Sequence, residues 1–122
     1  LTIFSSVYGG NCLVDLDVDD CKVKSEKGVS EAQYFLGMMY SEGDGVLQDY
    51  KVAVKWFRRS AEQGNSDGQY NLGMIPEDTF KYTSDLIMSM YSNCYLRNLI
   101  QGRASQGFLS YLEANKTVEC TG

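Results

Sequence analysis

Two short stretches of the sequence combine residue types that could perform chemistry. The first, Gly64-Asn-Ser-Asp-Gly68, has the spacing of a Gly-x-Ser-x-Gly nucleophile elbow. In that motif a strand presents the serine to a histidine base. The chain contains no histidine, and the residues before Gly64 have the pattern of a helix. We therefore interpret the motif as a turn between helices and expect no catalytic residue.

The second stretch is acidic and has part of the pattern of an EF-hand calcium loop. The carboxylates at positions 1, 3, 5 and 12 of such a loop would be Asp15, Asp17, Asp19 and Glu26. Position 6 requires a glycine for the turn but holds Asp20, and position 8 should be apolar but holds Lys22. We therefore expect a solvated acidic segment, with neither a metal nor another cofactor.

The remaining reactive side chains are the four cysteines, Cys12, Cys21, Cys94 and Cys120. An even number in a small chain is typical of two disulfides, and free buried thiols are the alternative. A structural zinc site is not expected, because the chain has no CxxC pair and no histidine. We predict that Cys12 pairs with Cys21 in the acidic segment and that Cys94 pairs with Cys120 near the C-terminus.

Length and charge limit the kinds of partner. A chain of 122 residues, 43% of them hydrophobic, is long enough for one modest core. Residues 1–50 carry nine acids and three bases, whereas residues 51–122 carry seven acids and eight bases. A nucleic-acid-binding protein would need a strongly basic face, so we expect no nucleic-acid partner.

The first ten residues indicate secretion. They are apolar and rich in small residues, and they resemble the end of a secretory signal peptide with Val7 and Gly9 before the cut. A buried first strand is the alternative. No apolar run approaches the roughly 20 residues that a membrane-spanning helix needs. We expect a secreted or periplasmic protein without a membrane span, in which residues 1–24 are the signal-peptide remnant and the acidic segment.

An internal repeat predicts the fold. Residues 26–39 align with residues 62–75 at an offset of 36, and eight of the 14 aligned positions are identical. A repeat of this length is typical of stacked helical pairs. The identical positions are Glu26/Glu62, Gly28/Gly64, Ser30/Ser66, Gln33/Gln69, Tyr34/Tyr70, Leu36/Leu72, Gly37/Gly73 and Met38/Met74.

The parts of the repeat fit a helix-turn-helix unit. We expect Ser30 to cap a first helix over about residues 31–41, and Gly43 and Gly45 to end it. Asp49 is expected to cap a second helix over about residues 50–63, which ends at Gly64. The chain then begins a second unit that stops after its first helix.

One face of each helix is expected to be buried within the repeat. Apolar residues that recur every three or four positions share a face, and Gly37 would allow a neighbouring helix to approach closely. Trp56 is expected to fill the space between the paired helices. The inward positions are Ala32, Leu36 and Tyr40 on the first helix and Ala53, Trp56, Phe57, Ser60 and Ala61 on the second.

This pattern resembles the Sel-one-like repeat, a relative of the tetratricopeptide repeat. The resemblance covers residues 25–75 and runs through Ala-Gln-Tyr-x-Leu-Gly-x-x-Tyr, Gly-x-Gly-Val, Asp, Ala-x-x-Trp-Phe and Ala-Glu-Gln-Gly. It implies an all-α fold, a short α/α solenoid stub with one full repeat and half of a second, that works as an adaptor. The second copy departs where Pro76 replaces Tyr40 and Gly68 replaces Ala32.

Residues 76–122 do not repeat and are expected to form a C-terminal helical cap. The region 79–100 is apolar on most sides of a helix, and Phe108, Tyr111 and Leu112 indicate a last helix ending near Asn115. A helix that is apolar on most sides must be covered. One and a half repeats cannot bury a core alone, so we expect the two parts to pack together.

Two surfaces of the repeat are candidate binding faces. Exposed Phe and Met on the inner face of the first helix would suit a peptide or a partner helix, with packing against the C-terminal helices as the alternative. The inner-face residues are Phe35, Met38, Met39 and Glu42. A basic face could meet an acidic partner or the chain's own acidic segment, with a solvated face as the alternative. Its residues are Lys51, Lys55, Arg58 and Arg59.

Three functions are weighed. The leading one is a non-enzymatic protein–protein interaction module of the bacterial envelope or secreted fraction, whose partner is another protein or peptide, or a second copy of the chain. An alternative is a periplasmic inhibitor or immunity-type protein acting through residues 79–122, which distantly resemble such proteins. A β-lactam-binding or hydrolysing enzyme, known among secreted Sel-one-like repeat proteins, is disfavoured because no serine has a lysine three residues later.

Overall fold

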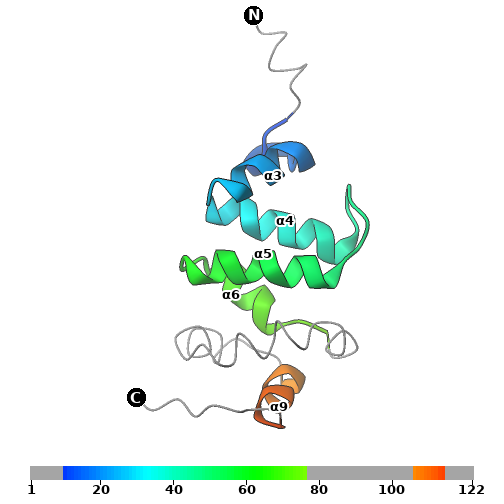
Figure 1. Cartoon of the computed structure of the whole chain (residues 1–122), viewed down its shortest axis with the longest axis vertical. Helices are drawn as coiled ribbons and strands as arrows, with labels where there is room; N and C mark the ends of the chain where they lie inside the picture. Colours follow the sequence, from blue (N-terminus) through cyan, green and yellow to red (C-terminus); the bar gives the residue numbers. More distant parts are fainter. Residues whose placement is uncertain (1–9, 77–105, 115–122) are drawn as a thin grey trace, which may run out of the picture.

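The computed structural model describes residues 10–76 and 106–114. The regular elements of these residues are all helices, stacked in chain order along the long axis of the molecule (Figure 1). The predicted all-α fold class is confirmed. The helices are α2 (Cys12–Asp15), α3 (Val18–Glu26), α4 (Ser30–Glu42), α5 (Tyr50–Glu62), α6 (Ser66–Gly73) and α9 (Gln106–Ala114).

Helices α4 and α5 form the predicted helical pair. Helix α4 ends at Gly43, whose φ of 73° lies in the left-handed region that glycine tolerates. Asp49 caps α5 by accepting hydrogen bonds from two backbone N–H groups of the first turn, at 3.0 and 3.2 Å. The prediction for Ser30 is wrong, because Val29 precedes α4 without a side-chain cap. The Ser30 hydroxyl instead donates to the Glu31 carboxylate.

Phe57, and not Trp56, fills the space between the paired helices. Phe57 is 4% exposed, whereas Trp56 is half-buried. Successive helical residues are about 100° apart around the axis, so a buried stripe centred on Phe57 includes Val54 at about 60° and leaves Trp56 at its edge. Val54 is 1% exposed and takes the inward place that the sequence assigned to Trp56.

Gly37 allows the Phe57 ring to lie against the backbone of α4. A Cβ atom at Gly37 would lie 2.6 Å from two ring atoms of Phe57, closer than packed atoms approach. The close approach expected at this glycine is confirmed. The other predicted inward positions that are buried on α4 and α5 are Ala32, Leu36, Ala53, Ser60 and Ala61, and Val54 is buried with them.

Helix α3 has the place of the second helix of a preceding repeat, which the sequence analysis did not predict. Shifted by the repeat length of 36, its residues 18–26 correspond to residues 54–62 of α5. Cys21 then falls on Phe57 and Ser25 falls on Ala61, and all four are buried. Helix α3 packs on α4 as α5 packs on α6 (Figure 1). Much of the segment expected to be solvated therefore belongs to the stack.

The same hydrogen bond joins each second helix to the first helix that follows it. Gln33 Nε2 donates to the backbone carbonyl of Ser25 at 3.0 Å, and Gln69 Nε2 donates to that of Ala61 at 3.4 Å. The two donors are 36 residues apart, as are the two acceptors, and both glutamines are buried. The recurrence of glutamine in the two copies therefore has a structural cause.

The Gly-x-Ser-x-Gly motif is the turn between α5 and α6, as interpreted from the sequence. Gly64 has a φ of 88°, and the Asn65 side chain caps α6 by accepting from the Gly68 backbone N–H at 2.9 Å. Ser66 is the first residue of α6. A Cβ atom at Gly68 would lie 2.6 Å from the hydroxyl of Ser60, which explains why glycine replaces alanine in this copy.

A disulfide joins α2 to α3. Cys12 and Cys21 are bonded to each other, and both are fully buried beside Leu36 and Met39 of α4. This is the pairing predicted for the acidic segment. The predicted partners Cys94 and Cys120 lie outside the described residues.

The carboxylates of the acidic segment cap short helices. Asp17 caps α3 by accepting from the backbone N–H of Asp20 at 2.9 Å. Asp20 in turn accepts from the backbone N–H of Cys12 at 2.7 Å and forms an ion pair with Lys24 at 2.7 Å. Within the described part of the chain, no group of three Asp, Glu or Cys side chains is arranged to hold a metal ion.

Acid is expected to loosen the attachment of α2 through Asp20. The hydrogen bond from the Cys12 N–H, followed by the Lys24 ammonium, lowers the pKa of Asp20 from the ordinary value of 3.8. Because the folded-state pKa is depressed, this carboxylate stabilises the fold above the ordinary value, and the contribution is lost as pH falls through the folded pKa.

Carboxyl-detected NMR titration would measure the Asp20 pKa directly. In Asp20→Asn, the large acid-induced shift of the Cys12 amide signal should disappear, while Asp19→Asn, on the same helix and exposed, should keep it. An Asp20 pKa equal to that of an aspartate in the unfolded chain would contradict this assignment.

The ends of the chain are described only in part. Helix α9 carries the predicted residues Phe108, Tyr111 and Leu112 and ends at Ala114, which confirms a helix there. None of the described helices is both long and apolar enough to cross a membrane. The predicted signal-peptide remnant at residues 1–9 and the predicted helix over 79–100 lie outside the described residues, so the C-terminal cap stays a prediction.

Candidate functional site

The predicted inner face of α4 does not form one exposed stripe. Met39 is 3% exposed and belongs to the cluster around the disulfide, and Phe35 is half-buried against the same cluster. Met38 is half-buried and Glu42 is exposed. Met39 is therefore a core residue, because α3 and its disulfide cover this side of α4. The predicted partner-binding role of Met38 and Glu42 stays a prediction.

Tyr34 of α4 lies beside two aromatic rings, one on its own helix and one on α5. Its ring centre is 5.0 Å from that of Phe35 and 6.4 Å from that of Phe57. Burial raises the pKa of Tyr34, and the carboxylates of Asp67 and Glu42 raise it further. Tyr34 is therefore uncharged at neutral pH and contributes aromatic packing.

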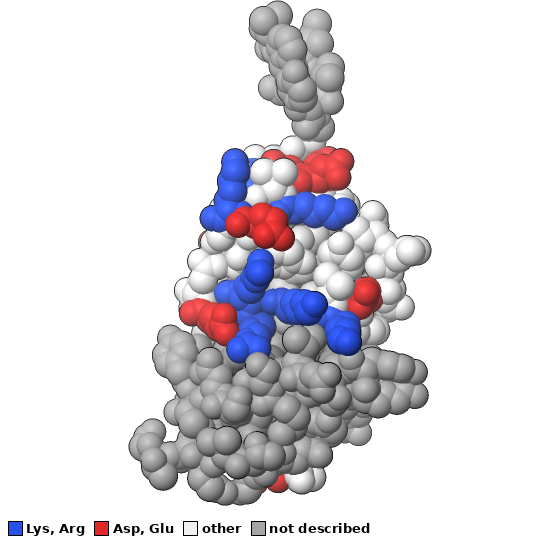
Figure 2. Space-filling model, viewed as in Figure 1, with Lys and Arg blue, Asp and Glu red and all other residues white. Residues whose placement is uncertain are grey.

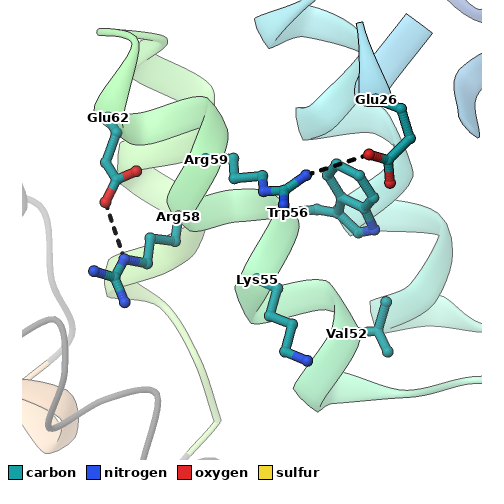
Figure 3. Close-up of a pocket in the computed structure, with 7 residues that line it drawn as sticks. All are labelled: Glu26, Val52, Lys55, Trp56, Arg58, Arg59 and Glu62. Carbon is teal, nitrogen blue, oxygen red and sulfur yellow. Dashed lines mark hydrogen bonds and ion pairs between the residues drawn. The ribbon is translucent and has the colours of Figure 1, made fainter. Parts of the chain in front are cut away.

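A groove of about 490 Å³ lies on the exposed side of α5, beside the end of α3 (Figure 3). Val52 and Trp56 give it an apolar surface, and charged side chains surround them. Six of the lining residues come from α5, and Glu26 comes from α3. The complete lining is Glu26, Val52, Lys55, Trp56, Arg58, Arg59 and Glu62.

Arg59 connects the two helices that form the groove. Its guanidinium carbon lies 4.9 Å from the centre of the Trp56 ring, a cation–π distance. The same guanidinium lies 3.7 Å from the Glu26 carboxylate at the end of α3 (Figure 3). The side chains of Arg59 and Glu26 are 55% and 70% exposed, so this ion pair is open to water.

The other cations differ in their partners. Arg58 donates from Nε to the Glu62 carboxylate, one helical turn away, at 3.0 Å. Lys55 is exposed and forms no ion pair within the part of the chain that the structure describes. Lys51, the fourth residue of the predicted basic face, is exposed but does not line the groove.

The basic residues of the groove follow from the sequence pattern, whereas the places of Trp56 and Glu26 in it do not. The repeat itself indicates that Trp56 does not lie in the core, because the residue 36 positions earlier is Asp20. The packed positions Val18 and Val54, one repeat apart, are both apolar, whereas an exchange of tryptophan for aspartate indicates a position that is not fully buried. The groove provides cations, an aromatic ring and an aliphatic surface, a set suited to binding, and its lining among the described residues includes no Ser, Thr or Cys.

A second cavity, of about 190 Å³, lies where α4, α5 and α6 meet. Its lining includes the predicted binding residue Glu42 together with Met74 and Pro76. Since Pro76 is the last described residue before the gap at 77–105, we assign no site to this cavity.

Helical pairs joined by one recurring hydrogen bond at intervals of 36 residues define an α/α repeat protein. Residues 30–65 match the family model of the Sel1 repeat, which is the Sel-one-like repeat that the sequence resembles. The chain therefore belongs to the Sel1-like repeat proteins.

Two similar proteins come from Acanthamoeba polyphaga mimivirus. The chain is 38% identical over 50 residues to putative sel1-like repeat-containing protein L18, covering 41% of this chain and 9% of that protein. It is 35% identical over 91 residues to putative sel1-like repeat-containing protein L21, covering 72% of this chain and 16% of that protein. The chain thus spans less than a fifth of either relative. No solved structure matches it significantly.

Proposed function

We propose that this chain is a non-enzymatic protein-binding module whose main contact surface is the groove on α5. Sel1 repeats generally mediate protein–protein interactions. The observation that carries the proposal is the groove itself, which gathers Trp56, Val52 and three cations on a packed helical frame. Tryptophan and arginine are enriched among residues that dominate binding energies, so this composition favours a partner-binding role.

The proposed setting is the secreted fraction or the bacterial cell envelope, where the module would act as an adaptor. The buried Cys12–Cys21 disulfide supports an oxidising compartment, because such bonds persist there. The proposed partner is another protein or peptide, since a net charge of −5 disfavours nucleic acid. Self-association through the same surface is the alternative.

Site-specific photo-crosslinking tests the contact surface. A photoreactive amino acid is placed at Val52, inside the groove, and in separate variants at Leu47, which is 91% exposed but outside it, and at Met38 on α4. With the secreted and envelope fractions of the source organism, adducts are expected from position 52 and not from position 47. Adducts from Met38 alone would assign binding to the inner face and contradict the proposal.

Two other functions remain distinguishable. The inhibitor-type alternative depends on residues 79–122, of which the structure describes only α9, and it stays a prediction. The non-enzymatic part of the proposal rests on the family's typical use as an interaction module. Hydrolysis of the chromogenic β-lactam nitrocefin by the purified chain would contradict it.

A further inference from the structure

We infer that the groove on α5 recognises an acidic peptide segment that carries one large apolar side chain. This inference rests on the proposed protein-binding function and specifies its partner. The apolar side chain would pack on Trp56 and Val52, and flanking carboxylates would bind Lys55 and Arg59. Three features support this partner: the local charge, the weakness of one ion pair, and the fixed position of the tryptophan.

The groove is a positive region on an acidic protein. Its lining contains three cations and two carboxylates, whereas the whole chain has a net charge of −5. Lys and Arg side chains form a row over α5, below a second group over α3 (Figure 2). An acidic segment is therefore attracted to this surface and repelled by most of the rest of the chain.

A carboxylate of the partner can readily replace Glu26 in the ion pair with Arg59. Its atoms are 3.7 Å apart and both side chains are more than half exposed, so water and salt screen the attraction. A partner carboxylate can replace Glu26 beside Arg59 with little loss. Lys55 can bind a partner carboxylate without first breaking an ion pair, because it forms none with the described residues.

Trp56 presents its ring from a fixed position. One side of the residue packs against the buried cluster around the disulfide, and Arg59 lies over the ring. Holding an aromatic side chain in place before binding reduces the conformational entropy lost when a partner arrives. With half-buried Val52 beside it in the lining, the ring offers a surface that an apolar side chain would complete.

The two carboxylates in the lining favour a peptide over a nucleic acid. A phosphate backbone would bring a continuous row of negative charges past Glu26 and Glu62. A peptide can place its carboxylates beside the cations and its apolar side chain between them. The groove therefore fits a few spaced charges better than a uniform polyanion.

The fluorescence of Trp56 reports on the groove directly, because it is the chain's one tryptophan. The probe is the peptide Asp-Glu-Asp-Phe-Glu-Asp-Glu with blocked ends, added to the full-length oxidised chain. We expect a saturable change in emission, and an affinity that falls as salt is raised. Replacing the peptide's Phe with Ser should weaken binding about tenfold. No saturable change would overturn the inference.

Matched charge reversals on α5 test the site. Lys55→Glu should weaken peptide binding at least about tenfold, whereas Lys51→Glu, the same change on the same helix outside the groove, should weaken it less than about threefold. Both lysines are exposed, so both variants should keep the wild-type melting temperature. Equal losses in the two variants, or equally tight binding of a single-stranded DNA of the same charge, would overturn the inference.

Failure of this inference is distinguishable from failure of the proposed function. If the peptide does not bind but Val52 still cross-links a partner, the acidic-peptide inference alone is overturned. If the peptide does not bind and Val52 gives no adduct, the proposed contact surface is overturned with it.

Discussion

Replacing Phe57 with alanine is expected to lower the free energy of unfolding by about 3–5 kcal/mol, the usual cost of truncating a buried aromatic side chain. Phe57 is 4% exposed and its ring lies against Gly37, where no side chain is present to move into the vacated space. The neighbouring Tyr34 ring, with its centre 6.4 Å away, would lose a packing partner. The cavity would lie at the centre of the α4–α5 pair.

Trp56→Ala is the matched control for this prediction. Trp56 is half-buried, so its truncation should cost about 1–2 kcal/mol, because less apolar surface returns to water. Urea denaturation followed by circular dichroism compares the two variants without depending on tryptophan emission. Equal midpoints, or a larger loss for Trp56→Ala, would show that Trp56 fills the core and that the inward stripe has been misassigned.

Removing the disulfide should have the second-largest effect. The free energy of unfolding of the double variant Cys12→Ala/Cys21→Ala is expected to be about 2–4 kcal/mol lower than that of the wild type. The disulfide restricts the unfolded chain between two residues that are nine positions apart. Both sulfur atoms are also fully buried, and Cys21 has the place in α3 that Phe57 has in α5. Loss of the bond therefore removes core packing as well as the link.

Amide hydrogen exchange would show which helices the disulfide stabilises. Amides of α2 and α3 should exchange faster in the double variant, while those of α5 change less, because α5 is held by its own contacts with α4 and α6. Val14→Ala, an 81% exposed position in α2, should shift stability by less than about 0.5 kcal/mol. Unchanged protection of α3 in the double variant would mean that the helix packs on α4 without the disulfide.

The repeat made much of this fold predictable. Helices α4 and α5 follow from apolar spacing and from local signals, such as the left-handed turn at Gly43 and the cap at Asp49, that act within a few residues. Helix α3 was missed because its inward positions hold Cys21 and Ser25, where α5 has Phe57 and Ala61, so no apolar stripe is visible. Its identity as a helix of the stack depends on packing against α4.

The candidate site was predictable only in part for the same reason. Lys55 and Arg59 are one helical turn apart on a single helix, so their shared face follows from sequence spacing. Glu26 and Trp56 are thirty residues apart and line the same groove only because α3 and α5 both pack against α4. Periodicity alone also does not decide whether Trp56 or Val54, on opposite sides of Phe57, faces inward.

The recurring hydrogen bond has a consequence for how such a protein can diverge. In each copy a glutamine side chain donates to a backbone carbonyl, and every amino acid has that acceptor. The acceptor residue is therefore free to change, as the difference between Ser25 and Ala61 illustrates, while the hydrogen bond between successive helical pairs is preserved. Positions such as those of Asp20 and Trp56 can then differ between units without disturbing this bond. Shape and specificity are under separate control, so one scaffold can acquire new partners by surface exchange alone.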